Sequence, residues 1–201
     1  MIYTVLDVET TGLSREYDDI LSFGYIRIDQ DFNVYDSNEL YFYKELFNIE
    51  KPQAQAIHGL TRDFLKQYEA DFSKNLSAMY SLCYNGNIIS KNGTKFDIPF
   101  IRSFCSRMCP ELDTLEFSKS YDIQDIFSGY YQKVTGSTKK GKLGDYLNVL
   151  DISTQDVSDE MMKLPRHGAG ISKLHGALFD ATATLMVLRK YCVMSNQTLG
   201  V

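Results

Sequence analysis

The stretch Met1-Ile-Tyr-Thr-Val-Leu-Asp7-Val-Glu9-Thr-Thr-Gly12 decides the fold, because an apolar run carries two carboxylates and ends in a turn. Residues 2–8 are typical of a buried strand, and residues two apart on a strand project from the same face. Asp7 and Glu9 would therefore lie side by side and repel each other unless a cation lies between them. Hard oxygen ligands favour magnesium, manganese or calcium. A lone Asp-x-Glu more often simply begins a polar loop, so further carboxylates must point to the same place.

Length and composition indicate an ordinary globular protein. The 201 residues are 44% hydrophobic and 23% charged, which fits a single domain over residues 1–201. The net charge of −5 does not indicate a nucleic-acid-binding protein, unless basic residues cluster locally or bound cations offset the carboxylates. The four cysteines do not form a disulfide framework or a zinc set. No signal peptide or membrane-length apolar run occurs, so we expect a cytoplasmic, or at least intracellular, protein with no membrane partner.

The pattern along the chain predicts an α/β sandwich around one mixed sheet. Strands are expected first as a β-meander with its first strand innermost, and then as a short fourth strand. Amphipathic helices follow the meander, and Thr61 can cap one of them. The expected strands are 2–8, 19–28, 34–43 and 87–91; the expected helices are 52–57, from 62, 70–84, from about 94 to 108, 121–134, 142–150, 158–164 and 173–194, with 151–170 otherwise irregular.

Three further stretches combine with Asp7 and Glu9. They are Asn92-Gly-Thr-Lys-Phe96-Asp97, which leads into a helix; His175-x4-Asp180, which opens the last helix; and His58-Gly-Leu-Thr61. With Asp7-Val-Glu9-Thr-Thr-Gly12, they resemble the motifs of the DEDDh-type 3′→5′ exonucleases. That family includes the epsilon proofreading subunit, ribonuclease T, oligoribonuclease and the three-prime repair exonucleases. Gly176 stands where the tyrosine variant of the family would carry Tyr, so the histidine variant is indicated. The longer stretch 156–173 departs from compact members of the family.

The resemblance implies a ribonuclease-H-like fold, with a mixed five-stranded sheet flanked by helices on both faces. It also implies a site for two divalent cations, Mg or Mn, held by Asp7, Glu9, Asp97 and Asp180. In that site Asp7 would bridge both ions, Glu9 and Asp180 would complete one site, and Asp97 would act largely through water. Glu9 would thus belong to the catalytic group together with His175, which would be the general base.

The resemblance also implies substrate contacts around the first motif. Thr10, Thr11 and Gly12 would seat the 3′ end, Leu13 would wedge against the terminal base, and His58 would line the groove. Asn92 would either contact the substrate or hold its loop.

Several residues have a second interpretation. Asp97 and Asp180 could be acids favoured by the helix dipole at a helix start. His167 competes with His175 as the base, although only His175 has the x4-Asp spacing. The lysines of the loop (Lys133, Lys139, Lys140 and Lys142) fit a solvated loop or a region that steers phosphates. Most aromatic residues fall at core spacing, so we assign them to the core.

We expect a 3′→5′ exonuclease that acts on the 3′ end of nucleic acid, with single-stranded DNA favoured. The alternative is an exoribonuclease or oligoribonuclease, because the 2′-OH contact that separates RNA from DNA is not encoded in these motifs. A remote alternative is an inactive fold relative that binds nucleic acid. The sequence leaves open whether a DNA polymerase is a partner.

Overall fold

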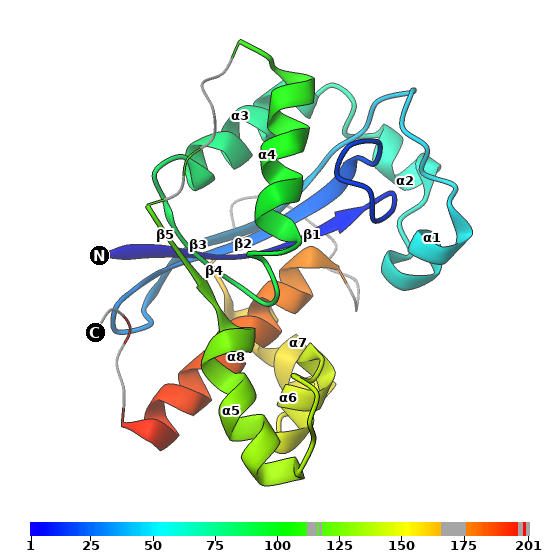
Figure 1. The fold of residues 1–201 in the computed structure, drawn as a ribbon. Coiled ribbons are helices and arrows are strands. Elements are labelled where there is room, and N and C mark those ends of the chain that lie inside the picture. The colour runs from blue at the N-terminus through cyan, green and yellow to red at the C-terminus, as the bar shows by residue number, and fades with distance from the viewer. Residues whose placement is uncertain (112–115, 117, 166–175, 197–198, 200–201) are drawn as a thin grey trace.

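A mixed sheet of five strands runs through the centre of the computed structural model, in the order β3-β2-β1-β4-β5 (Figure 1). The antiparallel pairs are β1–β2 and β2–β3, and the parallel pairs are β1–β4 and β4–β5. The structure describes residues 1–111, 116, 118–165, 176–196 and 199. The strands are β1 (Ile2–Thr10), β2 (Ile20–Asp29), β3 (Val34–Tyr41), β4 (Asn87–Ser90) and β5 (Lys119–Asp122).

Strand β1 lies in the middle of the sheet, as its two apolar faces predicted. Tyr3 and Val5 pack into one hydrophobic core, while Leu6 and Val8 pack into the core on the other side. Because side chains alternate along a strand, Asp7 continues the face of Tyr3 and Val5. The same alternation places the first carboxylate of the candidate site on the α8 side of the sheet.

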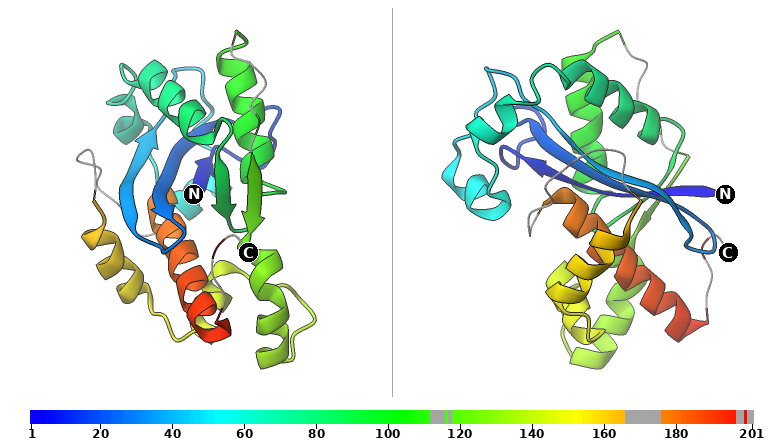
Figure 2. Two further views of the ribbon diagram at one scale, coloured as in Figure 1. Left: turned by 90° about the vertical axis from the view of Figure 1, so that its left-hand side faces the viewer. Right: turned by 180° about the vertical axis from the view of Figure 1, so that it is seen from behind.

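Helices cover both faces of the sheet, so the expected ribonuclease-H-like arrangement is confirmed (Figures 1 and 2). One face carries α3 (Phe72–Cys83) and α4 (Asp97–Met108). The opposite face carries α5 (Ile123–Thr135), α6 (Leu143–Val149), α7 (Thr154–Lys163) and α8 (Ala177–Ser195). Two short helices, α1 (Pro52–His58) and α2 (Arg62–Lys66), lie near the carboxyl end of β1.

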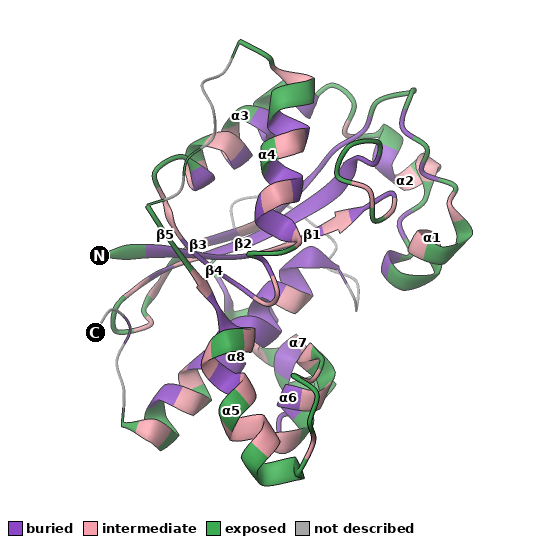
Figure 3. Ribbon diagram, viewed as in Figure 1, coloured by how far each residue is buried: buried purple, intermediate pink, exposed green. Residues whose placement is uncertain are grey.

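Burial follows these layers, with the inward sides of the strands and helices covered (Figure 3). The predicted inward residues of the last helix, Leu178, Ala181, Leu185 and Leu188, are all buried. Thr61 also caps α2 as predicted, since its side chain accepts a hydrogen bond from the Phe64 N–H.

Three boundaries differ from those predicted from the sequence. Helix α7 begins at Thr154 rather than near 158, because Ser153 and Asp156 form a reciprocal capping box that replaces the expected irregular stretch. Residues 119–122 form the edge strand β5, and Asp122 then caps α5 through the Gln124 N–H. Helix α8 begins at Ala177, later than the predicted 173.

Among the described residues, none of the helices is both long enough and apolar enough to cross a membrane.

Candidate active site

Three carboxylates meet at the carboxyl end of β1. Asp7 and Glu9 lie near the end of that strand, and Asp180 comes from the first turn of α8. One ligand oxygen from each of the three lies within 4.8 Å of the others, which is close enough for all three to hold a single cation. The sequence spacing therefore predicted the pair on β1 correctly, and the fold adds the third carboxylate from 171 positions further along the chain than Glu9.

A row of three residues across the sheet explains how α8 reaches this position. Asp7 pairs with Gly24 on β2, and Gly24 pairs with Glu39 on β3, so all three face the same side of the sheet. A Cβ atom on Gly24 would lie 2.2 Å from the backbone of Ala177 and of Leu178. The missing side chain of Gly24 thus makes room for the first turn of α8 between two carboxylates.

Asp97 completes the set of four acids from the other face of the sheet. It is buried at the first position of α4, and its Oδ1 accepts a hydrogen bond from the Val8 N–H at 3.2 Å. Val8 separates Asp7 from Glu9 in the sequence, so this bond fixes the start of α4 against the strand that carries the pair. Asp97 does not belong to the three-carboxylate group.

Burial and mutual repulsion of the carboxylates govern the electrostatics of the site. Burial is the main cause that raises the pKa of Asp7 well above its usual range, and the charges of Asp97 and Asp180 raise it further. Burial, followed by the charge of Asp180, raises the pKa of Glu9 to about 8. Burial also raises the pKa of Asp97 to about 7, although the Val8 N–H lowers it. A divalent cation would relieve both the repulsion and the burial cost of these charges, so the donor set fits a hard metal ion.

A cavity of about 530 Å³ opens beside Glu9. Its lining includes five of the residues predicted to contact the substrate: Thr10, Thr11, Gly12, Leu13 and His58. The Leu13 side chain is 87% exposed at the rim, where an apolar group can meet a ligand. The first motif and the His58 segment, which are distant in sequence, therefore form two walls of one cavity.

His58 is buried on the wall of this cavity, and its tautomer follows from its hydrogen bond. Its Nδ1 accepts from the Leu60 N–H at 2.9 Å, so a neutral ring carries its proton on Nε2. Burial lowers the pKa of His58, which favours this neutral form. Among the described residues, Nε2 has no hydrogen-bond partner, and the atom is itself buried.

The loop before β2 is tied to α1 by a partly buried ion pair that sequence reasoning missed. The Asp18 carboxylate accepts from Thr11 Oγ1 at 3.1 Å and from the Ser14 N–H at 2.9 Å, and it pairs with Lys51, the residue before α1. A Cβ on Gly12 would lie 2.5 Å from this carboxylate, so a side chain at this position would displace Asp18. Burial alone would raise the pKa of Asp18, but the hydrogen bonds from Lys51, Ser14 and Thr11 lower it overall.

Two other predicted residues stand apart from this cavity. Asn92 lies in a left-handed turn after β4, with φ of 60°, and its N–H donates to Asp122 Oδ1 at 2.7 Å. It does not line the cavity beside Glu9. His175 and its competitor His167 lie outside the described residues.

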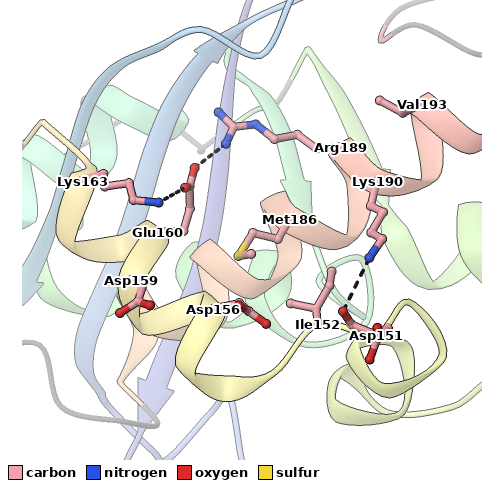
Figure 4. A pocket seen from close by; sticks show the side chains of 10 residues that line it. All are labelled: Asp151, Ile152, Asp156, Asp159, Glu160, Lys163, Met186, Arg189, Lys190 and Val193. Atoms are coloured by element: carbon pink, nitrogen blue, oxygen red, sulfur yellow. Dashed lines mark hydrogen bonds and ion pairs between the residues drawn. The ribbon is translucent and has the colours of Figure 1, made fainter.

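A second cavity of about 630 Å³ lies between α7 and α8 and contains none of the predicted site residues (Figure 4). One of its acids, Glu160, pairs with Arg189 at 2.7 Å and with Lys163 at 3.7 Å. Arg189 also donates to the carbonyl of Phe32 at 2.7 Å. These contacts hold the two helices and the β2–β3 turn together, so the cavity has a structural explanation.

Comparison with known proteins agrees with this geometry. The family model of the RNase T exonucleases matches residues 4–188. The chain belongs to the RNase T exonuclease family. This family membership, the fold and the acid cluster confirm the DEDDh type expected from the sequence, so the protein is a nuclease.

Relatives of this exonuclease include longer proteins. The DNA polymerase III PolC-type of Mycoplasma genitalium is 26% identical over 136 residues, which are 64% of this chain and 9% of that protein. A structure of exonuclease I matches 96% of this chain with a TM-score of 0.69 and 18% identity. The E. coli exonuclease I complex with a dT13 oligonucleotide matches 95% with a TM-score of 0.68 and 19% identity. The chain spans 41% and 40% of these two structures, respectively.

Glu39 is the site residue that sequence reasoning missed most clearly. Its buried side chain accepts a hydrogen bond from the Ala177 N–H at 3.2 Å, next to the first turn of α8. A charged residue within a predicted β-strand was the available signal, because Glu is seldom buried without a partner. Its partner lies 138 residues away, so the sequence pattern could not identify that partner.

Proposed function

We propose that this exonuclease removes nucleotides from the 3′ end of DNA and releases nucleoside 5′-monophosphates with the aid of two divalent cations, Mg or Mn. The observation that carries the proposal is the meeting of Asp7, Glu9 and Asp180 within 4.8 Å, with the buried Asp97 beside them. Four carboxylates provide about four negative charges, which two divalent ions would neutralise.

The four acids would have different roles as ligands of the ions. Asp7 would bind both, Glu9 and Asp180 would complete one site, and Asp97 would act largely through water. Bound divalent cations activate water at neutral pH and stabilise the leaving oxygen of a phosphodiester. The chain itself fixes the ligand directions, through the β1 backbone, the Val8–Asp97 hydrogen bond and the first turn of α8.

His175 would take the proton from the attacking water, because imidazole titrates near neutral pH. The family resemblance of the His175-x4-Asp180 spacing supports this role. We expect His175→Ala to lower kcat on the order of a hundred-fold or more while divalent cations still bind. An unchanged kcat in His175→Ala, with a large loss in His167→Ala, would transfer the role to His167.

The cavity beside Glu9 supports cleavage at a chain end. Its volume of about 530 Å³ lies within the range of roughly 300–1,000 Å³ typical of small-ligand pockets. The terminal nucleotide would enter it with its sugar near Thr10 to Gly12 and its base against Leu13. The Nε2–H of His58 would donate to an acceptor of that nucleotide. Asn92 would act more indirectly, by holding the loop that leads to Asp97.

The comparisons support DNA as the substrate. Exonuclease I, which shares the fold, has been solved in complex with dT13 and dA16 oligonucleotides. The PolC-type relative is a DNA polymerase, which supports a polymerase as a proposed partner of this chain. An RNA substrate is the competing proposal, and the described residues include no group that we can assign to a 2′-OH.

Matched single-stranded DNA and RNA oligonucleotides, each labelled at the 5′ or the 3′ end, test this proposal. With Mg²⁺ or Mn²⁺, DNA labelled at its 3′ end should release the label first, as a mononucleotide. DNA labelled at its 5′ end should become shorter by one nucleotide at a time. EDTA should abolish both. Faster hydrolysis of RNA would replace the DNA assignment, and release from the 5′ end would overturn the direction.

A further inference from the structure

The first turn of α8 rests on the row formed by Asp7, Gly24 and Glu39. This turn carries Asp180, so its position decides where the third carboxylate of the site lies. The residue that precedes the helix, Gly176, has no side chain and supplies no side-chain cap. The first backbone N–H groups of a helix have no acceptor within the helix, so those of α8 depend on acceptors from elsewhere in the chain.

Glu39 supplies one of these groups from β3. Its Oε1 accepts from the Ala177 N–H at 3.2 Å, and both residues are buried. A carboxylate at a helix N-terminus is also favoured by the helix dipole. Gly24 lies between Asp7 and Glu39 and leaves the space into which the backbone of Ala177 and of Leu178 fits. The hydrogen bond fixes the helix along the sheet, and the close approach at Gly24 fixes its height above the sheet.

We infer that Glu39, with Gly24, is a positioning residue of this nuclease: it caps α8 from a neighbouring strand and so sets Asp180 at ligand distance from Asp7 and Glu9. The inference rests on the proposed metal-dependent hydrolysis and extends it to a residue outside the three-carboxylate group. Ligand geometry is demanding, and a displacement of about 1 Å in a catalytic group can cost on the order of a hundred-fold in rate.

Two variants disturb the same position by different means. Glu39→Ala removes the acceptor, and Gly24→Ala places a Cβ 2.2 Å from the helix backbone, so α8 must shift. We expect each to lower kcat by roughly 10- to 100-fold, and to weaken Mn²⁺ binding measured by calorimetry on the DNA-free protein by a similar order. The KM for a single-stranded DNA oligonucleotide should stay close to that of the wild type, because the cavity that would hold the terminal nucleotide is not altered.

Glu39→Gln is the conservative rescue, since its amide oxygen can still accept from the Ala177 N–H. It should recover most of the kcat and the Mn²⁺ affinity. If the kcat and the Mn²⁺ affinity of Glu39→Gln are as low as those of Glu39→Ala, the hydrogen bond is not the cause and the inference is overturned.

Arg189→Met provides the matched control for a merely weakened helix. It removes contacts of α8 to Glu160 and Phe32, away from Asp180. It should lower Tm without changing kcat or Mn²⁺ affinity. Glu39→Ala and Gly24→Ala variants that also lose only Tm would show a structural role alone and overturn the inference. Failure of the wild type to bind Mn²⁺ or hydrolyse DNA would instead overturn the proposed function.

Discussion

Two groups of acidic side chains lie along helix α8, one at its first turn and one further along the helix. At the first turn Asp180 joins Asp7 and Glu9, and their neighbours Asp97 and Glu39 are also acids. Further along, beside the second cavity, Glu160 of α7 pairs with Arg189 of α8 and with Lys163 of its own helix (Figure 4). Glu160 thus has two counter-charges within the protein, whereas the charges of neighbouring acids raise the pKa values of Asp7 and Glu9.

The difference shows why acid content alone does not identify a metal site. Acids that are paired with Arg or Lys contribute modestly to stability. Acids that are packed against one another raise the free energy of the folded chain until protons or cations neutralise them. The sequence alone does not distinguish the two groups, because the difference lies in which side chains surround each acid in the folded structure.

Removing one acid from each group should give the largest difference in catalytic activity. Asp7→Asn deletes the central carboxylate of the site, and we expect kcat/KM for a DNA oligonucleotide to fall on the order of a thousand-fold or more, since metal stabilisation is worth several kcal/mol. Asp159→Asn, in the second cavity, should leave kcat/KM unchanged. In EDTA, Asp7→Asn should be at least as stable as the wild type, because a repelling charge is gone. A marked loss of Tm there would contradict the comparison.

The sequence predicted the parts of the site that short-range periodicity governs. The i, i+2 spacing placed Asp7 and Glu9 near the end of a central strand, and the resemblance added Asp97 and Asp180. Strands β1 to β4 and most helices also follow from alternation and from helical spacing.

Other features depended on contacts between distant segments. Edge strand β5 has only four residues, of which three are not buried, so little alternation marks it. Glu39 meets Ala177 across 138 positions, and Lys51 meets Asp18 across 33. Such pairs leave no local pattern. The box of Ser153 and Asp156 could have been found, because its two members are three apart, the spacing of a capping box.

The comparison can also be tested by removing the cation that pairs with a buried acid. Asp18 lies beside the candidate site, yet its pairing with Lys51 keeps its pKa low, in contrast to Glu9. Lys51→Met leaves this carboxylate buried without its cation, and we expect a loss of about 1–3 kcal/mol in the free energy of unfolding. The KM should also rise, because the pair ties the two walls of the cavity together.

Chemical denaturation and steady-state kinetics measure the two effects. Lys51→Arg retains a cation and should stay near the wild type in both measurements. The double variant Lys51→Met/Asp18→Asn should recover part of the stability, since no uncompensated charge remains. Equal stability of Lys51→Met and the wild type would show that the pair contributes little.

The pairs of the second cavity should influence stability alone. Arg189→Met removes one ion pair and a hydrogen bond to the Phe32 carbonyl, while Glu160 keeps Lys163 at 3.7 Å. We expect a loss of about 1–2 kcal/mol, which corresponds to roughly 2–8 °C in Tm for a chain of this size. Thermal melts and hydrolysis assays on one preparation check this, and a changed kcat would mean that the two ends of α8 are coupled.

The pH dependence of stability in the absence of metal tests the comparison without any substitution. Folding raises the pKa of Glu9 from 4.5, the value of a free glutamate side chain, to about 8. Burial is the main cause of this shift, followed by the charge of Asp180. Between these two pH values the folded protein binds more protons than the unfolded chain, so stability falls as pH rises and the contribution is lost above about 8. In EDTA, Tm should therefore decline across this window.

Manganese should reduce that decline, because a bound cation replaces the proton as the neutralising charge. Glu9→Gln should reduce it as well, since an amide does not titrate in this range. Scanning melts of the wild type in EDTA, of the wild type in Mn²⁺ and of Glu9→Gln in EDTA, at matched pH values and ionic strength, separate these effects. A wild-type Tm in EDTA that rises between pH 4.5 and 8 would contradict the predicted sign, because an acid with a lowered pKa, such as Asp18, is already ionised in both states over this window. The acid cluster would then carry less strain than its geometry implies, and cations would bind there for their ligands rather than for charge relief.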